Sequence, residues 1–249
     1  MNGPLVAVAH GSRDPRSAAT VHALLDVLRE RRPGVDARAS FLDLSAPRLG
    51  DVLAALHGDG HRHAVVVPLL LGRAYHARVD IPALIGEAQA RLPRLSVCTS
   101  DVLGPDESLE STALRRLSEA GVPRHDPELG VVLAGTGSSS QEANAVVDRI
   151  AARWESRHGW AGVAAGFAAA EPGLPEAVRR LRERGARRIA VASWFLAPGL
   201  LLDRIIEQAG DEDPGAVVAE PLGPAQAIAD LVIRKYTGAQ PRVESLRYA

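Results

Sequence analysis

The same order of segments occurs twice along this chain, and this duplication restricts its fold more than any other feature. An apolar run that ends in a Gly-Ser pair lies at residues 6–12 and again at 131–138. Matching positions are about 120 to 126 residues apart, which is the length of one small α/β domain. The duplication therefore predicts two similar domains that face each other across a pseudo-two-fold axis. The other matching segments are 40–47 and 166–172, 60–66 and 185–191, 70–76 and 195–201, and 101–105 and 220–224.

Within the first copy, short apolar runs alternate with amphipathic segments. The runs are too short for helices and are bounded by turn residues, which is typical of buried parallel strands. The amphipathic segments carry apolar residues at helical spacing. This alternation predicts a parallel sheet with right-handed crossovers. The expected strands are 6–9, 35–44, 64–71 and 95–103, and the expected helices are 17–32, 47–56, 81–92 and 109–120.

We therefore expect an α/β protein with two similar domains, each a small parallel sheet flanked by helices. The first domain is expected at residues 1–121 and the second, a degenerate repeat, at 130–237. Residues 122–129 contain two prolines among charged residues, which is typical of a linker. The polar residues 238–249 are expected to form a tail.

Composition excludes several classes of protein. The net charge of -1 argues against a nucleic acid or an anionic membrane held by bulk electrostatics. Cys98 is the only cysteine, so one chain can form neither an internal disulfide nor a cluster of thiolate metal ligands. No apolar run approaches the roughly 20 residues that span a bilayer, and the N-terminus lacks the basic and apolar regions of a leader. We therefore expect a cytoplasmic protein.

The two copies differ at polar residues where strands of the first copy end. His10, Asp43 and His76 in the first copy correspond to Thr136, Ala169 and Leu201 in the second. A residue that the fold requires should persist in both copies, whereas a residue of a site used once should persist in one. Because ligands bind at the carboxyl ends of strands in open α/β sheets, the three side chains are expected to converge on one crevice.

Two chemistries are open to this trio. Two neutral imidazoles and a carboxylate are a common ligand set for a divalent metal such as Fe(II), Co(II), Ni(II) or Zn(II). The same groups could also transfer protons. The first domain is thus expected to carry the active site, and the second to form the opposite wall.

The motifs around these residues resemble those of a known family. The residues concerned are Ala9–Pro15, Phe41–Asp43, Val67–His76 and Asp80–Pro82. They resemble the class II tetrapyrrole chelatases, and within them the two-domain sirohydrochlorin chelatases of the CbiX/SirB type. The resemblance extends over nearly the whole chain, including the second copy.

The resemblance implies a lyase that inserts Fe(II) or Co(II) into sirohydrochlorin, for siroheme or cobalamin synthesis. The family's catalytic, metal-binding histidines correspond to His10 and His76, and its second-strand acidic residue, usually glutamate, corresponds to Asp43. The metal is then a substrate, and no permanently bound cofactor is expected. Because sirohydrochlorin carries several carboxylates, the candidate substrate-binding residues are Ser12, Arg13, Arg73 and Arg78, with Arg48 less favoured.

The expected partners are sirohydrochlorin and a divalent metal ion, with the protein a monomer or weak dimer that binds neither nucleic acid nor membranes. Two other functions stay open. One is a carrier that binds a tetrapyrrole or metal without catalysis. The other is a metal-dependent hydrolase, in which a histidine-bound metal would activate water.

Overall fold

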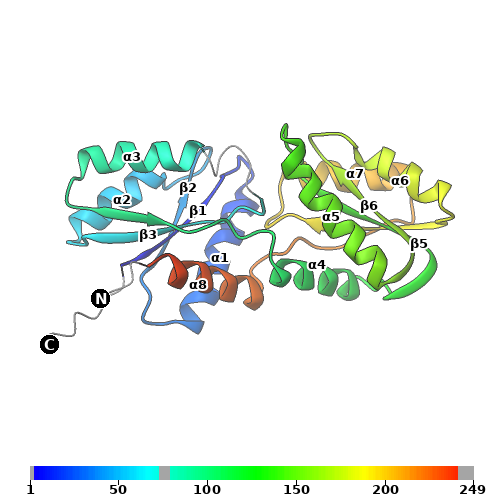
Figure 1. Ribbon diagram of the computed structural model, residues 1–249, viewed down its shortest axis with the longest axis horizontal. Helices are drawn as coiled ribbons and strands as arrows, with labels where there is room; N and C mark the ends of the chain where they lie inside the picture. Colours follow the sequence, from blue (N-terminus) through cyan, green and yellow to red (C-terminus); the bar gives the residue numbers. More distant parts are fainter. Residues whose placement is uncertain (1–2, 73–78, 241–249) are drawn as a thin grey trace, which may run out of the picture.

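The computed structural model describes residues 3–72 and 79–240, which form two α/β halves side by side (Figure 1). In the first half the elements are β1 (Leu5–Ala9), α1 (Pro15–Arg31), β2 (Ala37–Phe41), α2 (Leu49–Gly58), β3 (His63–Pro68), α3 (Ile81–Arg91), β4 (Ser96–Thr99) and α4 (Glu107–Glu119). In the second half they are β5 (His125–Gly135), α5 (Gln141–Arg157), β6 (Gly159–Phe167), α6 (Leu174–Glu183), β7 (Arg188–Trp194), α7 (Leu200–Glu212), β8 (Val217–Val218) and α8 (Gln226–Ala239).

The two sheets have the same topology. The strand order is β2-β1-β3-β4 in the first and β6-β5-β7-β8 in the second, and all the pairings are parallel. The fold class predicted from the duplication is therefore confirmed: an α/β chain with two similar parallel sheets, each flanked by helices.

Alternation along β1 explains how its sheet is covered on both faces. Leu5, Ala7 and Ala9 belong to the core that includes α1, whereas Val6 and Val8 belong to the core that includes α2 and α3. All five residues are buried, as is typical of a central parallel strand. Helix α1 begins with Pro15 in its first turn, and the Asp14 carboxylate accepts a hydrogen bond from the Arg16 N–H, which caps the helix.

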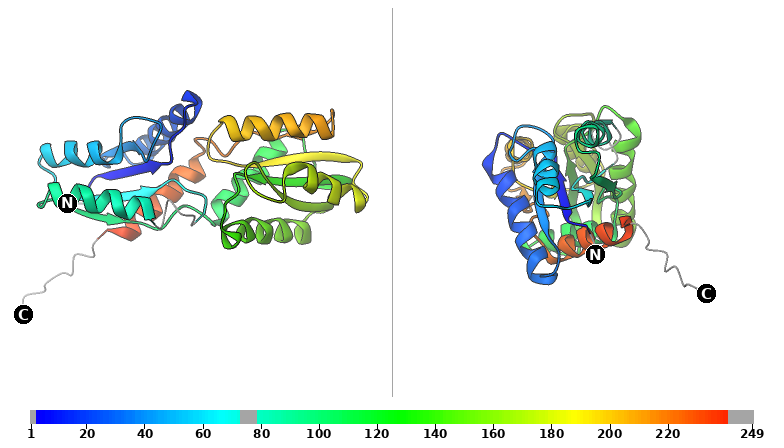
Figure 2. Two further views of the ribbon diagram at one scale, coloured as in Figure 1. Left: turned by 90° about the horizontal axis from the view of Figure 1, so that it is seen from above. Right: turned by 90° about the vertical axis from the view of Figure 1, so that its left-hand side faces the viewer.

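The last helix of each half packs on the other half. Helix α4 contacts β7 of the second sheet, and α8 contacts β3 and α1 of the first (Figures 1 and 2). Arg31 of α1 makes an ion pair with Asp230 of α8, with Nε and Oδ1 2.6 Å apart, and the Tyr236 hydroxyl donates to the Gly3 carbonyl at 2.6 Å. One continuous hydrophobic core consequently runs through both halves.

The expected domains at 1–121 and 130–237 did not include such an exchange of helices. Each sheet instead obtains one covering helix from the other half. The expected linker 122–129 also differs, because β5 begins at His125 and residues 125–129 are already part of that strand. Helix α8 continues to Ala239, two residues into the expected tail, and residues 241–249 lie outside the described residues.

A membrane-spanning helix is not found: within residues 3–72 and 79–240, every helix is too short or too polar to cross a bilayer.

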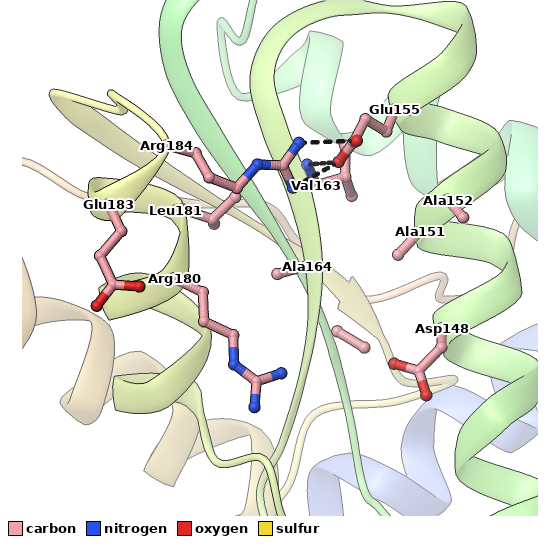
Figure 3. Close-up of a pocket in the computed structure, with 11 residues that line it drawn as sticks. Asp148, Ala151, Ala152, Glu155, Val163, Ala164, Arg180, Leu181, Glu183 and Arg184 are labelled. Carbon is pink, nitrogen blue, oxygen red and sulfur yellow. Dashed lines mark hydrogen bonds and ion pairs between the residues drawn. The ribbon is translucent and has the colours of Figure 1, made fainter.

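The outer edge of β6 is covered by a salt bridge between two helical segments. Arg184, directly after α6, donates from Nη2 to Oε1 of Glu155 on α5 at 2.8 Å, and Oε2 of Glu155 accepts the Val163 N–H at 2.9 Å (Figure 3). The Arg184 hydrogen bond is the main cause that holds the pKa of Glu155 below its ordinary value. The pair thus satisfies a backbone donor that the edge strand would otherwise present to solvent. These residues line a groove of about 430 Å³, far in sequence from the predicted site.

We expect Glu155→Ala to lower the free energy of unfolding by about 1–2 kcal/mol, because the mutation leaves the Val163 N–H and the Arg184 guanidinium without their acceptor. Urea denaturation measures this change. The matched control is Glu183→Ala. Glu183 lines the same groove and makes an exposed ion pair with Arg179, and its loss is expected to lower the free energy of unfolding by less than about 0.5 kcal/mol. Equal losses in the two variants would contradict a special role for the Glu155 carboxylate.

Candidate active site

His10 follows β1 directly and lies at the carboxyl edge of the first sheet. The next residue, Gly11, has a φ of 93°, in the left-handed region that glycine tolerates. A Cβ on Gly11 would lie 1.7 Å from the Asp43 carbonyl oxygen, so only glycine fits this contact. The Asp43 N–H donates to the His10 carbonyl at 3.0 Å. The loops after β1 and β2 are therefore joined at the two predicted site residues.

The Asp43 carboxylate is exposed and held by a local network. Its Oδ1 accepts the Leu44 N–H at 2.8 Å and lies 2.8 Å from Nη1 of Arg48. The pKa of Asp43 is lowered by the Leu44 hydrogen bond and further by the charges of Arg48 and His10. Asp43 is therefore ionised at neutral pH. Arg48, the less favoured candidate for the substrate, is the ion-pair partner of this carboxylate.

Ser12 is part of the same loop. Its Oγ accepts the Asp14 N–H at 3.1 Å, its N–H donates to Ser45 Oγ at 3.1 Å, and its carbonyl accepts the Ser45 hydroxyl at 2.9 Å. These bonds fix the backbone between β1 and α1. The exposed Arg13 follows within the same turn.

Two adjoining cavities meet at His10, between the two halves. One has a volume of about 510 Å³ and reaches from the end of β3 to the end of β5 and the start of α5. The other has a volume of about 450 Å³ and lies between the loop after β1 and the start of α7. Both are lined by His10, Thr136, Phe195 and Leu201. The crevice predicted at the strand ends is therefore present, with the second half as its opposite wall.

The matching positions of the second half lack ionisable groups. Thr136 follows β5 as His10 follows β1, and the Ala169 N–H donates to the Thr136 carbonyl at 2.9 Å, as Asp43 does to His10. Gly137 has a φ of 83°, like Gly11. The backbone of the site is thus repeated, while the ionisable groups of His10 and Asp43 have no counterpart at the matching positions Thr136 and Ala169.

Arg204 of α7 is a crevice residue that the sequence did not indicate. It lines the 450 Å³ cavity together with Arg13 and donates from Nη1 to the Ala168 carbonyl at 3.1 Å. Its position in the copy without the histidine motifs gave no signal, because arginines are frequent throughout this chain.

Three predicted site residues, Arg73, His76 and Arg78, lie outside the described residues. Within the parts of the chain that the structure describes, no group of three or more His, Cys, Asp and Glu side chains is placed to hold a metal ion. The roles of His10, Asp43 and His76, and those of Ser12, Arg13, Arg73 and Arg78, consequently stay predictions.

A protein-family model described as CbiX matches residues 4–120 and matches again at 130–239. This chain belongs to the CbiX family. A relative of this CbiX chain, the sirohydrochlorin ferrochelatase of Priestia megaterium, is 27% identical over 229 residues, with 90% of this chain and 86% of the relative covered. The sirohydrochlorin cobaltochelatase of the same organism is 26% identical over 203 residues, with 80% and 66% covered.

The fold of the CbiX chain is also that of a solved structure, SirB from Bacillus subtilis with Fe3+. The two superpose with a TM-score of 0.79 at 23% sequence identity, and 96% of each chain is covered. This likeness establishes a shared architecture over nearly the whole chain.

Proposed function

We propose that this chain is a sirohydrochlorin chelatase, a cytoplasmic lyase that inserts Fe(II) or Co(II) into sirohydrochlorin. The observation that carries the proposal is His10 in the wall of the crevice, with Asp43 hydrogen-bonded to its backbone, whereas the matching residues Thr136 and Ala169 carry no ionisable group. Family membership supports it, because curated relatives are named as ferrochelatases and cobaltochelatases of this tetrapyrrole.

The reaction joins a divalent metal ion to the macrocycle and releases two pyrrole N–H protons. His10, together with His76, is proposed to bind the metal substrate through a neutral imidazole, which can release the metal to the ring. The Asp43 carboxylate lies beside His10 and stays ionised, so it can attract the metal and accept a proton for transfer to water.

The crevice orients the two substrates. Sirohydrochlorin carries carboxylates around its rim, and guanidinium groups recognise carboxylates through paired hydrogen bonds. Arg13 and Arg204 enter the same cavity from opposite halves and are proposed to bind such groups, with the Ser12 hydroxyl as a further donor. Holding the ring and the metal together in the crevice supplies the orientation that the reaction needs.

Anaerobic absorption spectroscopy of sirohydrochlorin tests the proposal, with purified protein and either Fe(II) or Co(II). We expect conversion to the metallated spectrum over many turnovers with at least one metal, at a rate well above that without protein. The metal that supports faster conversion identifies the product. A stoichiometric spectral shift without turnover would instead indicate a carrier, and an unchanged spectrum would contradict both functions.

A further inference from the structure

Two exposed leucines from distant parts of the chain line the same cavity as His10. Leu44 follows β2 in the first half, with 45% of its surface exposed, and Leu200 begins α7 in the second half, with 65% exposed. Single exposed apolar side chains are common on protein surfaces and need no explanation. Two of them in one cavity, from opposite halves and beside a predicted catalytic histidine, indicate a surface for a ligand.

The backbone of Leu44 gives a second, independent indication. Its φ is 60°, and it is the one non-glycine residue with positive φ among residues 3–72 and 79–240. This conformation is unfavourable for a leucine, and such strain persists only where the surroundings enforce it. The Asp43 network does so, because Oδ1 of Asp43 accepts the Leu44 N–H and the Asp43 carbonyl accepts the Ser45 N–H at 2.7 Å.

The same strain is absent from the second copy. The position that matches Leu44 there is Ala170, which has no positive φ. A conformation confined to the copy with His10 and Asp43 is not required by the repeated fold.

Leu200 is likewise not needed for packing. The buried residues of α7 are Leu202, Ile205 and Ala209, which face the core of the second half. Leu200 precedes this buried stripe and lines the crevice instead.

We infer that Leu44 and Leu200 form an apolar clamp that holds the ring of the tetrapyrrole over His10, an inference that rests on the proposed function. The cavity has the chemistry of such a ligand. Its leucines fit a flat apolar ring, and Arg13 and Arg204 of the same cavity fit the carboxylates at the rim. The clamp recruits one side chain from each half, so the second half contributes to substrate binding although it lacks the histidines.

The test uses Leu44→Asn and Leu200→Gln, singly and together, in the full chain. Asparagine tolerates the left-handed conformation at position 44, and glutamine retains a good helix propensity at the start of α7. The matched control is Ile206→Gln, on the same helix and 46% exposed but outside both cavities.

We expect each clamp variant to raise the dissociation constant of metal-free sirohydrochlorin about tenfold, because an apolar contact is lost. An absorption titration without metal measures this constant independently of turnover. The KM for the tetrapyrrole should rise similarly, while the KM for the metal should match that of the Ile206→Gln control. Neither clamp variant should unfold at a lower temperature than that control, and Leu44→Asn should unfold at a higher one because asparagine tolerates the positive φ.

Two outcomes separate the inference from the proposed function. Clamp variants that bind sirohydrochlorin as tightly as the Ile206→Gln control, in a protein whose wild type inserts metal, would overturn the clamp alone. A wild type that inserts no metal with Fe(II) or Co(II) would overturn the proposed function. A rise in the KM for the metal alone would also contradict the clamp, since it would place the leucines at the metal.

Discussion

His10→Ala is expected to reduce metal insertion about a hundredfold or more, because it removes a group that binds the metal or moves a proton in the crevice. His76→Ala is expected to do the same on the evidence of the sequence motif. Initial rates of metallation, measured anaerobically at saturating sirohydrochlorin, give the comparison.

The second copy provides the matched controls. Thr136→Ala and Leu201→Ala change the corresponding positions of the repeat. These residues line the crevice but carry no group that binds a metal ion or transfers a proton, so at saturating sirohydrochlorin the variants are expected to retain most of the activity, within about threefold. Equal losses from the histidine variants and from these controls would mean that the site had been assigned to the wrong half.

Gly11→Ala is expected to combine a loss of stability with a loss of activity. The added methyl group would meet the Asp43 carbonyl oxygen, so the loops after β1 and β2 must separate. The forced left-handed alanine and this displacement together should lower the free energy of unfolding by about 2 kcal/mol or more. Where the variant is folded, insertion should fall about tenfold or more, because His10 and Asp43 no longer hold their relative positions.

Gly137→Ala is the control for this variant in the second copy. Gly137 has the same positive φ, and its added Cβ would lie 2.7 Å from the Ala170 Cβ. The control should also be destabilised, as urea denaturation will show. Its metallation rate per folded molecule should stay near that of the wild type. A similar loss of rate in both glycine variants would contradict the claim that the His10–Asp43 junction has a catalytic purpose.

The sequence predicted the sheets because the relevant signals are local. Each apolar run is bounded by its own turn residues, and the duplication shows the same succession of segments twice along the chain. The approach of Asp43 to His10 was also predictable, since the carboxyl ends of neighbouring parallel strands share one edge.

The exchange of α4 and α8 was not predictable in the same way. The apolar stripe of α4, with Leu109, Ala113 and Leu117, shows that one face must be buried but does not show against which sheet. The two sheets have the same topology, so the pattern of apolar residues along α4 does not distinguish between them.

The residues of the second half that line the crevice were also not predicted from the sequence. Arg204 and Leu200 have no motif of their own, and their relevance follows only from the cavity that they share with His10. A comparison of the two copies could identify which polar residues the second copy lacks, but not which of its own residues line the crevice.

The proposal that the first half binds the metal substrate is tested most directly by diffraction from crystals soaked with Co(II), measured at the cobalt absorption edge. We predict an anomalous peak at about 2.0–2.2 Å from a ring nitrogen of His10, inside the crevice. A peak beside Thr136, or metal bound only at histidines away from the crevice, would contradict this assignment.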